Sequence, residues 1–294
     1  MNKTPDILCI GSVLWDVIGR SEAAMRQGSD MPGRITRLPG GVGLNIAMAL
    51  ARFGLTPGLL SVVGRDAEGE ELIKACDVRG LLTQFIYRSE DLPTDQYMAV
   101  EGSNGLIAAI ADAHSLEAAG DKILRPFSDG SLPTPYRGTV ALDGNLTVDL
   151  LSEIARSPLF SEANLLVAPA SPGKALRLSP FLEAKRGTLY VNLEEAGLLC
   201  QTSFDGSAEA AAGLLDRGCV RAVVTDGGRP ASVADRSGTL TLTPPQVHVA
   251  RVTGAGDTFM AAHIASELDG AEPEAAFNAA LKAAAVYVSG ETKI

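Results

Sequence analysis

The chain has 294 residues, of which 46% are hydrophobic and 5% aromatic, and its 25 basic and 35 acidic residues give a formal net charge of −10. This composition is typical of a soluble α/β protein rather than a disordered or fibrous one, and the length allows one large domain or a domain with an inserted lid. The acidic balance disfavours nucleic-acid and membrane partners, so an anionic substrate would need a local positive site.

The four cysteines, Cys9, Cys76, Cys200 and Cys219, stand far apart, with no Cys-x-x-Cys pair and no histidine at a ligand spacing. We expect reduced, mostly buried thiols. No apolar stretch approaches the roughly 20 residues that cross a bilayer, and the apolar run at 7–10 is too short for a signal peptide. These features predict a cytoplasmic protein.

Strand-like and helix-like segments alternate along the chain. In chain order we expect a strand at 7–10, a helix at 44–52, a strand at 59–63, a helix at 68–78, a strand at 139–142, a helix at 148–155, a strand at 165–168, a helix at 175–184, a strand at 189–191, a helix at 208–217, a strand at 222–225 and a final helix from Pro273 to about 288. This order predicts a mostly parallel sheet with helices on both faces.

One region breaks the alternation. Three strands are expected between residues 83 and 111, and the turn at 103–105 joins two of them as a hairpin. Together with an extended piece at 33–38, they predict a small antiparallel lid, formed by approximately 14–38 and 84–112, on a single domain of residues 1–294. The alternative is a hairpin lying on the sheet edge.

The segment 39–45 places Gly40, Gly41 and Gly43 directly before a helix. Such a loop lets a ligand approach the backbone, and Asn45 at the helix start offers a donor and an acceptor to a polyol. Asp16 follows the first strand, where ligands of parallel sheets gather. Asp16 and Asn45 could therefore bind vicinal hydroxyls, although Asp16 could equally be a turn residue.

A second glycine turn, Gly254-Ala255-Gly256-Asp257, follows a segment that we expect to be extended, 247–252, and precedes a helix at 258–268. The first amides of a helix lack acceptors within it and favour an anion. Asp257 beside such an anion could accept a proton from a hydroxyl that attacks phosphorus. The alternative is a plain turn in which Asp257 caps the helix.

Two common nucleotide motifs are missing. The first strand-helix turn lacks the Gly-x-Gly-x-x-Gly of dinucleotide-binding folds, and the sequence contains no P-loop, since Gly173-Lys174 lacks the earlier glycine and the hydroxyl residue. A nicotinamide-dependent oxidoreductase is therefore disfavoured, and any nucleotide must be held by other means.

The two glycine motifs, 40–47 and 252–259, occur in the order and at the separation that resemble both signatures of the ribokinase-like (PfkB) family of sugar and nucleoside kinases. The resemblance runs over essentially the whole chain and implies a doubly wound α/β fold with an inserted β lid. It implies that Asp257 is the general base, that Gly254, Ala255 and Gly256 form the anion hole, and that Asp16, Gly40, Gly41 and Asn45 hold the acceptor.

The same resemblance implies ATP and Mg²⁺ as cofactors. Asn192 and Glu195 match the family's Asn-x-x-Glu motif, in which Glu195 would reach the metal largely through water. The nucleotide contacts would come from Thr225, Gly227, Gly228 and Asn278. A helix-start pair such as Asn192 and Glu195 is also readable as an ordinary helix cap.

Two positions depart from the family pattern. Arg251 stands where members with a monovalent-cation site often carry Asp, which argues against a potassium site of the usual form. Ala168 stands where an acidic residue is frequent at a strand end, so one water-mediated magnesium contact would be missing.

Within the family, the segment 32–47 and the lid end 109–112 are most similar to pseudouridine kinases. This implies phosphorylation of the ribose 5'-hydroxyl, with Tyr97 and Asp112 as contacts of the substrate, and a possible homodimer through the lid. The alternatives are a kinase of ribose, fructose, 2-keto-3-deoxygluconate or adenosine, or a non-catalytic sugar or nucleoside sensor on the same fold.

Overall fold

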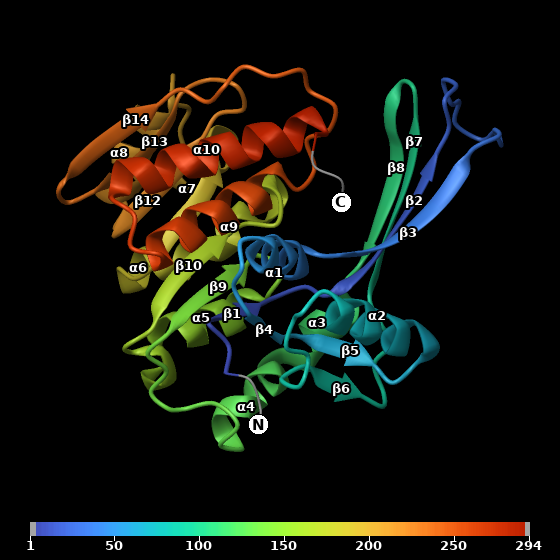
Figure 1. The fold of residues 1–294 in the computed structure, drawn as a ribbon, viewed down its shortest axis with the longest axis horizontal. Coiled ribbons are helices and arrows are strands. Elements are labelled where there is room, and N and C mark those ends of the chain that lie inside the picture. Colours follow the sequence, from blue (N-terminus) through green and yellow to red (C-terminus); the bar gives the residue numbers. More distant parts are fainter. Residues whose placement is uncertain (1–3, 292–294) are drawn as a thin grey trace.

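The computed structural model describes residues 4–291. Within this range a helix-covered sheet forms the body of the molecule, and the strands of a smaller sheet rise clear of it at the right of Figure 1. None of the described helices combines the length and the apolar character that a membrane crossing needs.

The main sheet of the described chain has eight strands. In spatial order they are β14 (Gly238–Leu242), β13 (Ala231–Asp235), β12 (Arg221–Thr225), β11 (Thr188–Asn192), β10 (Asn164–Ala168), β9 (Thr139–Asp143), β1 (Ile7–Ile10) and β4 (Pro57–Leu60). Pairing is parallel from β12 to β4 and antiparallel at β13 and β14. The mostly parallel sheet is confirmed. The two antiparallel strands, β13 and the edge strand β14, were not expected, because their short segments, rich in Ala, Ser and Thr, carry a weak apolar pattern.

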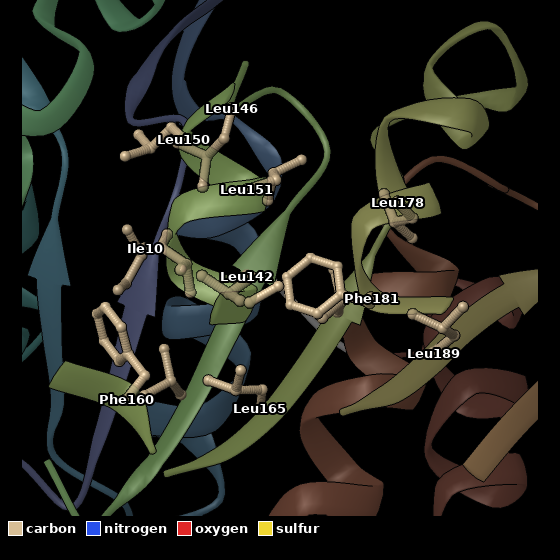
Figure 2. Packing of buried hydrophobic residues seen from close by; sticks show 14 of the residues in the cluster. Ile10, Leu142, Leu146, Leu150, Leu151, Phe160, Leu165, Leu178, Phe181 and Leu189 are labelled. Carbon is tan, nitrogen blue, oxygen red and sulfur yellow. The ribbon is translucent and has the colours of Figure 1, made fainter. Parts of the chain in front are cut away.

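Both faces of the sheet are covered, as predicted. Side chains alternate along each strand, so Leu8 and Ile10 of β1 enter one core, whereas Ile7 and Cys9 enter the other. Figure 2 shows the first core, where Leu142 of β9 and other strand residues pack against the helices of that face. A parallel sheet buried on both sides explains why its strands are apolar without alternation.

The helices divide between these two cores. On the first face are α3 (His114–Ala119), α4 (Arg125–Ser128), α5 (Val148–Arg156), α6 (Ser179–Ala184), α7 (Leu193–Cys200) and α8 (Ser207–Asp216), and on the second are α1 (Val42–Arg52), α2 (Ala67–Val78), α9 (Ala255–Leu268) and α10 (Pro273–Ser289). The 3₁₀ helices are η1 (Gly120–Leu124), η2 (Pro158–Phe160) and η3 (Pro172–Leu178).

The smaller sheet has the spatial order β3 (Arg34–Gly40), β2 (Leu14–Arg20), β7 (Gln96–Gly102) and β8 (Gly105–Asp112). Its two outer pairings are antiparallel, as expected, and the central pair of β2 and β7 is parallel. The earlier strand β6 (Tyr87–Ser89) pairs instead with β5 (Val62–Gly64). The small sheet is thus built from two hairpins that lie far apart in the sequence.

Two predicted elements differ from the structure, and the segment expected to be extended before α9 joins no sheet. The strand expected at 59–63 is divided between β4, in the main sheet, and β5, which pairs with β6. The segment 247–252 forms no strand; it follows Pro244-Pro245, which lack amide hydrogens, and it is held at Ala250 by a bond to Val288 O. The predicted helix 175–184 is instead η3 followed by α6. Pro180 has no backbone N–H to donate to a preceding carbonyl, so the helical hydrogen bonds of η3 do not continue into α6.

Candidate active site

The starts of helices α1 and α9 meet at the carboxyl edge of the main sheet. The side-chain amide of Asn45, in α1, faces the carboxylate of Asp257, in α9, and favours its charged form. The two helices also share a core through residues such as Leu44 and Met260. The two glycine motifs recognised in the sequence therefore belong to one site.

Asp257 is the third residue of α9, and Gly254 occupies the N-cap position in a left-handed conformation with φ 86°. Asp257 is therefore not the N-cap, which was the alternative interpretation of this turn. A Cβ on Gly256 would meet no atom within 4 Å, so the amides of this first turn can be approached closely. The geometry is that of an anion site with a carboxylate beside it.

Three acidic side chains shape the ionisation of this site. Loss of water around the carboxylate raises the pKa of Asp257 to about 7, and the negative charges of Asp143 and Asp16 add to the rise, while the Asn45 hydrogen bond opposes it. Burial also raises the pKa of Asp16 to about 6. A carboxylate with a pKa near neutrality suits a general base.

The glycine-rich loop packs against the turn that follows β1. Gly41 has φ 94°, and a Cβ there would stand 2.6 Å from Ser12 O. The space above Gly40 is taken by the Asp16 carboxylate. These glycines are therefore needed for close packing of the loop on the β1 turn as well as for contact with a ligand.

Asp143 is a central residue of the site that sequence reasoning missed. It is fully buried at the end of β9, and its Oδ2 accepts hydrogen bonds from Ser12 N at 2.7 Å, Ser12 Oγ at 2.7 Å and Gly43 N at 2.8 Å. Its carboxylate thereby fastens the glycine-rich loop to the β1 turn. The only signal in the sequence was an acidic residue directly after an apolar strand.

The small sheet presents two different faces. Asp16 pairs with Tyr97 in register, so their side chains share the face toward Asp257. Burial and the Asp16 charge raise the pKa of Tyr97. Asp112 pairs with Gln96, one residue out of phase with Tyr97, and lies 2.8 Å from the exposed His114 ring. The register thus places Asp112 on the opposite face from Asp16, and its substrate contact stays a prediction.

The predicted nucleotide residues lie further along the same sheet edge. Thr225 ends β12, and Gly227 and Gly228 form the following turn, where an added Cβ would meet nothing within 4 Å. Gln246 Nε2 donates to Gly228 O at 3.1 Å, so the 243–250 segment crosses this turn. Asn278 lies exposed on α10, directly after the buried Phe277. Its nucleotide contact also stays a prediction.

Asn192 and Glu195 form a reciprocal cap at the start of α7. Asn192 Oδ1 accepts from Glu195 N at 2.9 Å, and Glu195 Oε2 accepts from Asn192 N at 2.8 Å. Burial raises the pKa of Glu195 to about 6. Among residues 4–291, no cluster of three or more His, Cys, Asp or Glu side chains could hold a metal by itself. Asn192 and Glu195 fit a magnesium ion that keeps most of its waters and is not enclosed by protein ligands.

Arg251 is bound to the end of the last helix. Its guanidinium lies 3.9 Å from the ring centroid of Tyr287 and its Nε donates to Tyr287 O at 2.8 Å. The Tyr287 hydroxyl donates to Thr253 O at 2.9 Å and stands 2.5 Å from where a Cβ on Gly254 would be. Arg251, which departs from the family pattern, thus holds Tyr287, and Tyr287 in turn supports the turn at Thr253 and Gly254.

The site residues are ordered across the sheet edge. β1 lies between β4 and β9, so the strand order reverses there, which is where ligands bind in doubly wound sheets. Asp16 and Asp143 lie at this reversal point, and Thr225 lies further along the same edge, at the end of β12. Asp257 comes from α9, which covers the second face of the sheet. The arrangement can hold a hydroxyl acceptor and an anionic donor on either side of one carboxylate.

Comparisons with known proteins identify the family and the fold. Residues 4–292 match the model of the pfkB family carbohydrate kinases. The pseudouridine kinase of Escherichia coli (strain K12) is 30% identical over 279 residues, which cover 92% of this chain and 86% of that protein. The crystal structure of ribokinase from Thermotoga maritima has a TM-score of 0.83 at 19% identity and covers 97% of this chain and 93% of its own. Arabidopsis thaliana ribokinase, solved with ribose and ATP, has a TM-score of 0.78 at 19% identity, covering 99% and 94%.

Proposed function

The chain belongs to the pfkB family of carbohydrate kinases, and we propose that it transfers the γ-phosphoryl group of ATP to the ribose 5'-hydroxyl of pseudouridine. The observation that carries the proposal is the packing of α1 against α9, which sets Asn45 of the acceptor loop beside Asp257 of the anion turn. The choice of pseudouridine is supported by the 30% identity to the Escherichia coli pseudouridine kinase along most of both chains.

In the proposed reaction the acceptor hydroxyl binds beside Asp16, Asn45 and the Gly40-Gly41 backbone. Asp257 takes the hydroxyl proton while the acceptor oxygen forms a bond to the γ-phosphorus and the bond from that phosphorus to the bridging oxygen of ADP breaks. The amides of Gly254, Ala255 and Gly256 would stabilise the phosphoryl oxygens. Magnesium, near Glu195 through water, would neutralise phosphate charge when bound.

The small sheet would act as a lid in this reaction. Its inner face carries Asp16 and Tyr97, so its closure would bring acceptor contacts together and exclude water that competes for the phosphoryl group. The lid sheet and the body belong to one domain in this proposal, because β2 follows directly from the β1 turn.

The outer face of the same sheet supports a homodimer. Ile35, Met98 and Ile110 have exposed fractions of 80%, 47% and 62% and share this face by register. We call these three residues the outer lid patch. An exposed apolar group of this kind suits a second copy of the chain. A cytoplasmic location fits the four cysteines, which are all free thiols.

The proposed function is tested by ADP release with magnesium and ATP over a panel of pseudouridine, uridine, adenosine, ribose, fructose and 2-keto-3-deoxygluconate. We expect the highest kcat/KM with pseudouridine and a product with phosphate on a CH₂ oxygen by phosphorus NMR. Turnover of a free hexose or keto acid with no nucleoside turnover would contradict the substrate while retaining the kinase. Nucleoside binding with no turnover of any acceptor would instead indicate a sensor.

A further inference from the structure

Four polar side chains form a hydrogen-bonded chain that runs from Asp143 to Lys174. Lys174 Nζ donates to Asn145 Oδ1 at 2.5 Å, Asn145 Nδ2 donates to Ser12 Oγ at 2.9 Å, and Ser12 Oγ donates to Asp143 Oδ2 at 2.7 Å. Three strand ends or their following turns contribute to it, because Ser12 follows β1, Asn145 follows β9, and Lys174 lies in η3 after β10. None of its members belongs to the two glycine motifs.

The inner end of this chain is rigid. Asp143 is fully buried, and its second oxygen, Oδ1, accepts from Asn145 N at 2.5 Å. The backbone of Asn145 is therefore fixed by Asp143. Its side-chain amide is held at both atoms, because Oδ1 accepts from Lys174 and Nδ2 donates to Ser12. A buried carboxylate with each oxygen bonded fixes the groups around it. Lys174 is consequently placed by a chain of contacts that begins at the glycine-rich loop.

The chain also lies on the acceptor side of the site. Ser12 O stands next to Gly41, and Asp143 binds Gly43 N. The charge of Asp143 acts on Asp257 and on Lys174 alike, so both the general base and the lysine lie near this carboxylate. The charged groups around Lys174 are Asp143, Glu117 and Arg177, and the half-buried ammonium keeps two N–H donors beyond the one given to Asn145.

We propose that Lys174, positioned by Asn145, donates hydrogen bonds to a carbonyl oxygen on the nucleobase of the acceptor. This inference rests on the proposed function and names the part of the substrate that the site recognises. A carboxylate could use the same donors, but Asp16, Asp143 and Asp257 gather close by, and three acidic groups disfavour an anionic acceptor. A neutral carbonyl, such as the two of a uracil ring, is the group that fits.

The test compares Lys174→Met and Lys174→Arg with the unaltered protein. Calorimetry without ATP measures the Kd of pseudouridine, uridine, ribose and 2-keto-3-deoxygluconate, and ADP release measures kcat and KM for the same four. For Lys174→Met we expect nucleoside Kd and KM to rise about 10- to 100-fold, the effect of losing a hydrogen bond from a charged donor. We expect kcat to change less than threefold and ribose binding to be unchanged. Lys174→Arg should recover part of the loss, and Lys74→Ala, an exposed lysine of α2, is the matched control.

Each contrary result identifies what failed. Unchanged nucleoside Kd in Lys174→Met would overturn the role of Lys174, and an equal loss for ribose and nucleosides would show a structural role instead. A loss confined to 2-keto-3-deoxygluconate would assign the lysine to a carboxylate. If the unaltered protein binds nucleosides but transfers no phosphate to them, the proposed function fails while the binding measurement still decides the role of Lys174. If it binds no nucleoside, both fail.

Discussion

Asn45, in the first turn of α1, lies beside the carboxylate of Asp257, in the first turn of α9, and favours its charged form. This contact makes a single site of two loops that lie near opposite ends of the chain. It also ties the acceptor loop to the ionisation of the proposed base, because the Asn45 amide favours the charged carboxylate, whereas burial disfavours it.

Replacement of the proposed base should affect the rate and not binding. Asp257→Asn is expected to lower kcat by roughly two to four orders of magnitude, the usual contribution of a general base, with acceptor KM changed less than threefold. Steady-state ADP release measures both constants. Asp149→Asn, an exposed acid of α5, is the control. Near-normal turnover of Asp257→Asn would remove Asp257 from the mechanism.

The pH dependence should report the raised carboxylate pKa values. Asp257, with a pKa of about 7, acts as a base only when ionised, so kcat/KM should rise with pH, reach half its maximum near pH 7 and level above it. Asp16, with a pKa of about 6, should steepen the fall at lower pH. Asn45→Ala removes the bond that favours the ionised form, so its profile should move to higher pH. A profile level down to pH 5 would contradict this account.

Arg251 should support the anion turn without any added cation. We expect equal rates in potassium and choline chloride at constant ionic strength. Arg251→Ala should lower kcat about tenfold, since it loses a cation–π contact and a hydrogen bond to the end of α10. Millimolar guanidinium should restore part of that rate. Arg236→Ala, in an exposed turn, serves as the control. Strong potassium activation of the unaltered protein would refute the prediction.

Gly41 should tolerate no side chain. Gly41→Ala forces a residue with a Cβ into φ 94° and against Ser12 O, a strain of ~1–3 kcal/mol. We expect a lower Tm and a higher acceptor KM. Gly173→Ala is matched in chemistry, and its added Cβ would meet only Ser171 Oγ at 4.0 Å. Equal Tm values for the two variants would show that the loop adapts.

The outer lid patch should hold two copies together. Met98→Lys with Ile110→Lys places two charges on the exposed face of the small sheet, where apolar contact between copies would bury them. Light scattering after size exclusion should show a dimer for the unaltered chain and a monomer for the double variant. The control variant Val148→Lys, at an exposed position of α5, should stay dimeric. A monomeric unaltered chain would rule out this interface.

Much of the body was predictable because its signals are local. Continuous apolar runs such as 7–10 and helices ended by glycine at positions such as Gly54 follow from backbone geometry and burial alone. The family resemblance carried by the paired glycine motifs also predicted one site for Asn45 and Asp257. The segment 247–252, expected to be extended, joins no sheet, because extended residues become a strand only where a neighbouring edge can receive their hydrogen bonds.

The sequence by itself determined the residue types at the site and their order along the chain. Only the tertiary structure decided which of them meet. Asp143 joins the site because β9 lies beside β1, Asp112 turns from Asp16 because one step of register changes the face of a strand, and Lys174 approaches through Asn145. These outcomes depend on pairing between distant segments, and no local pattern carries that information.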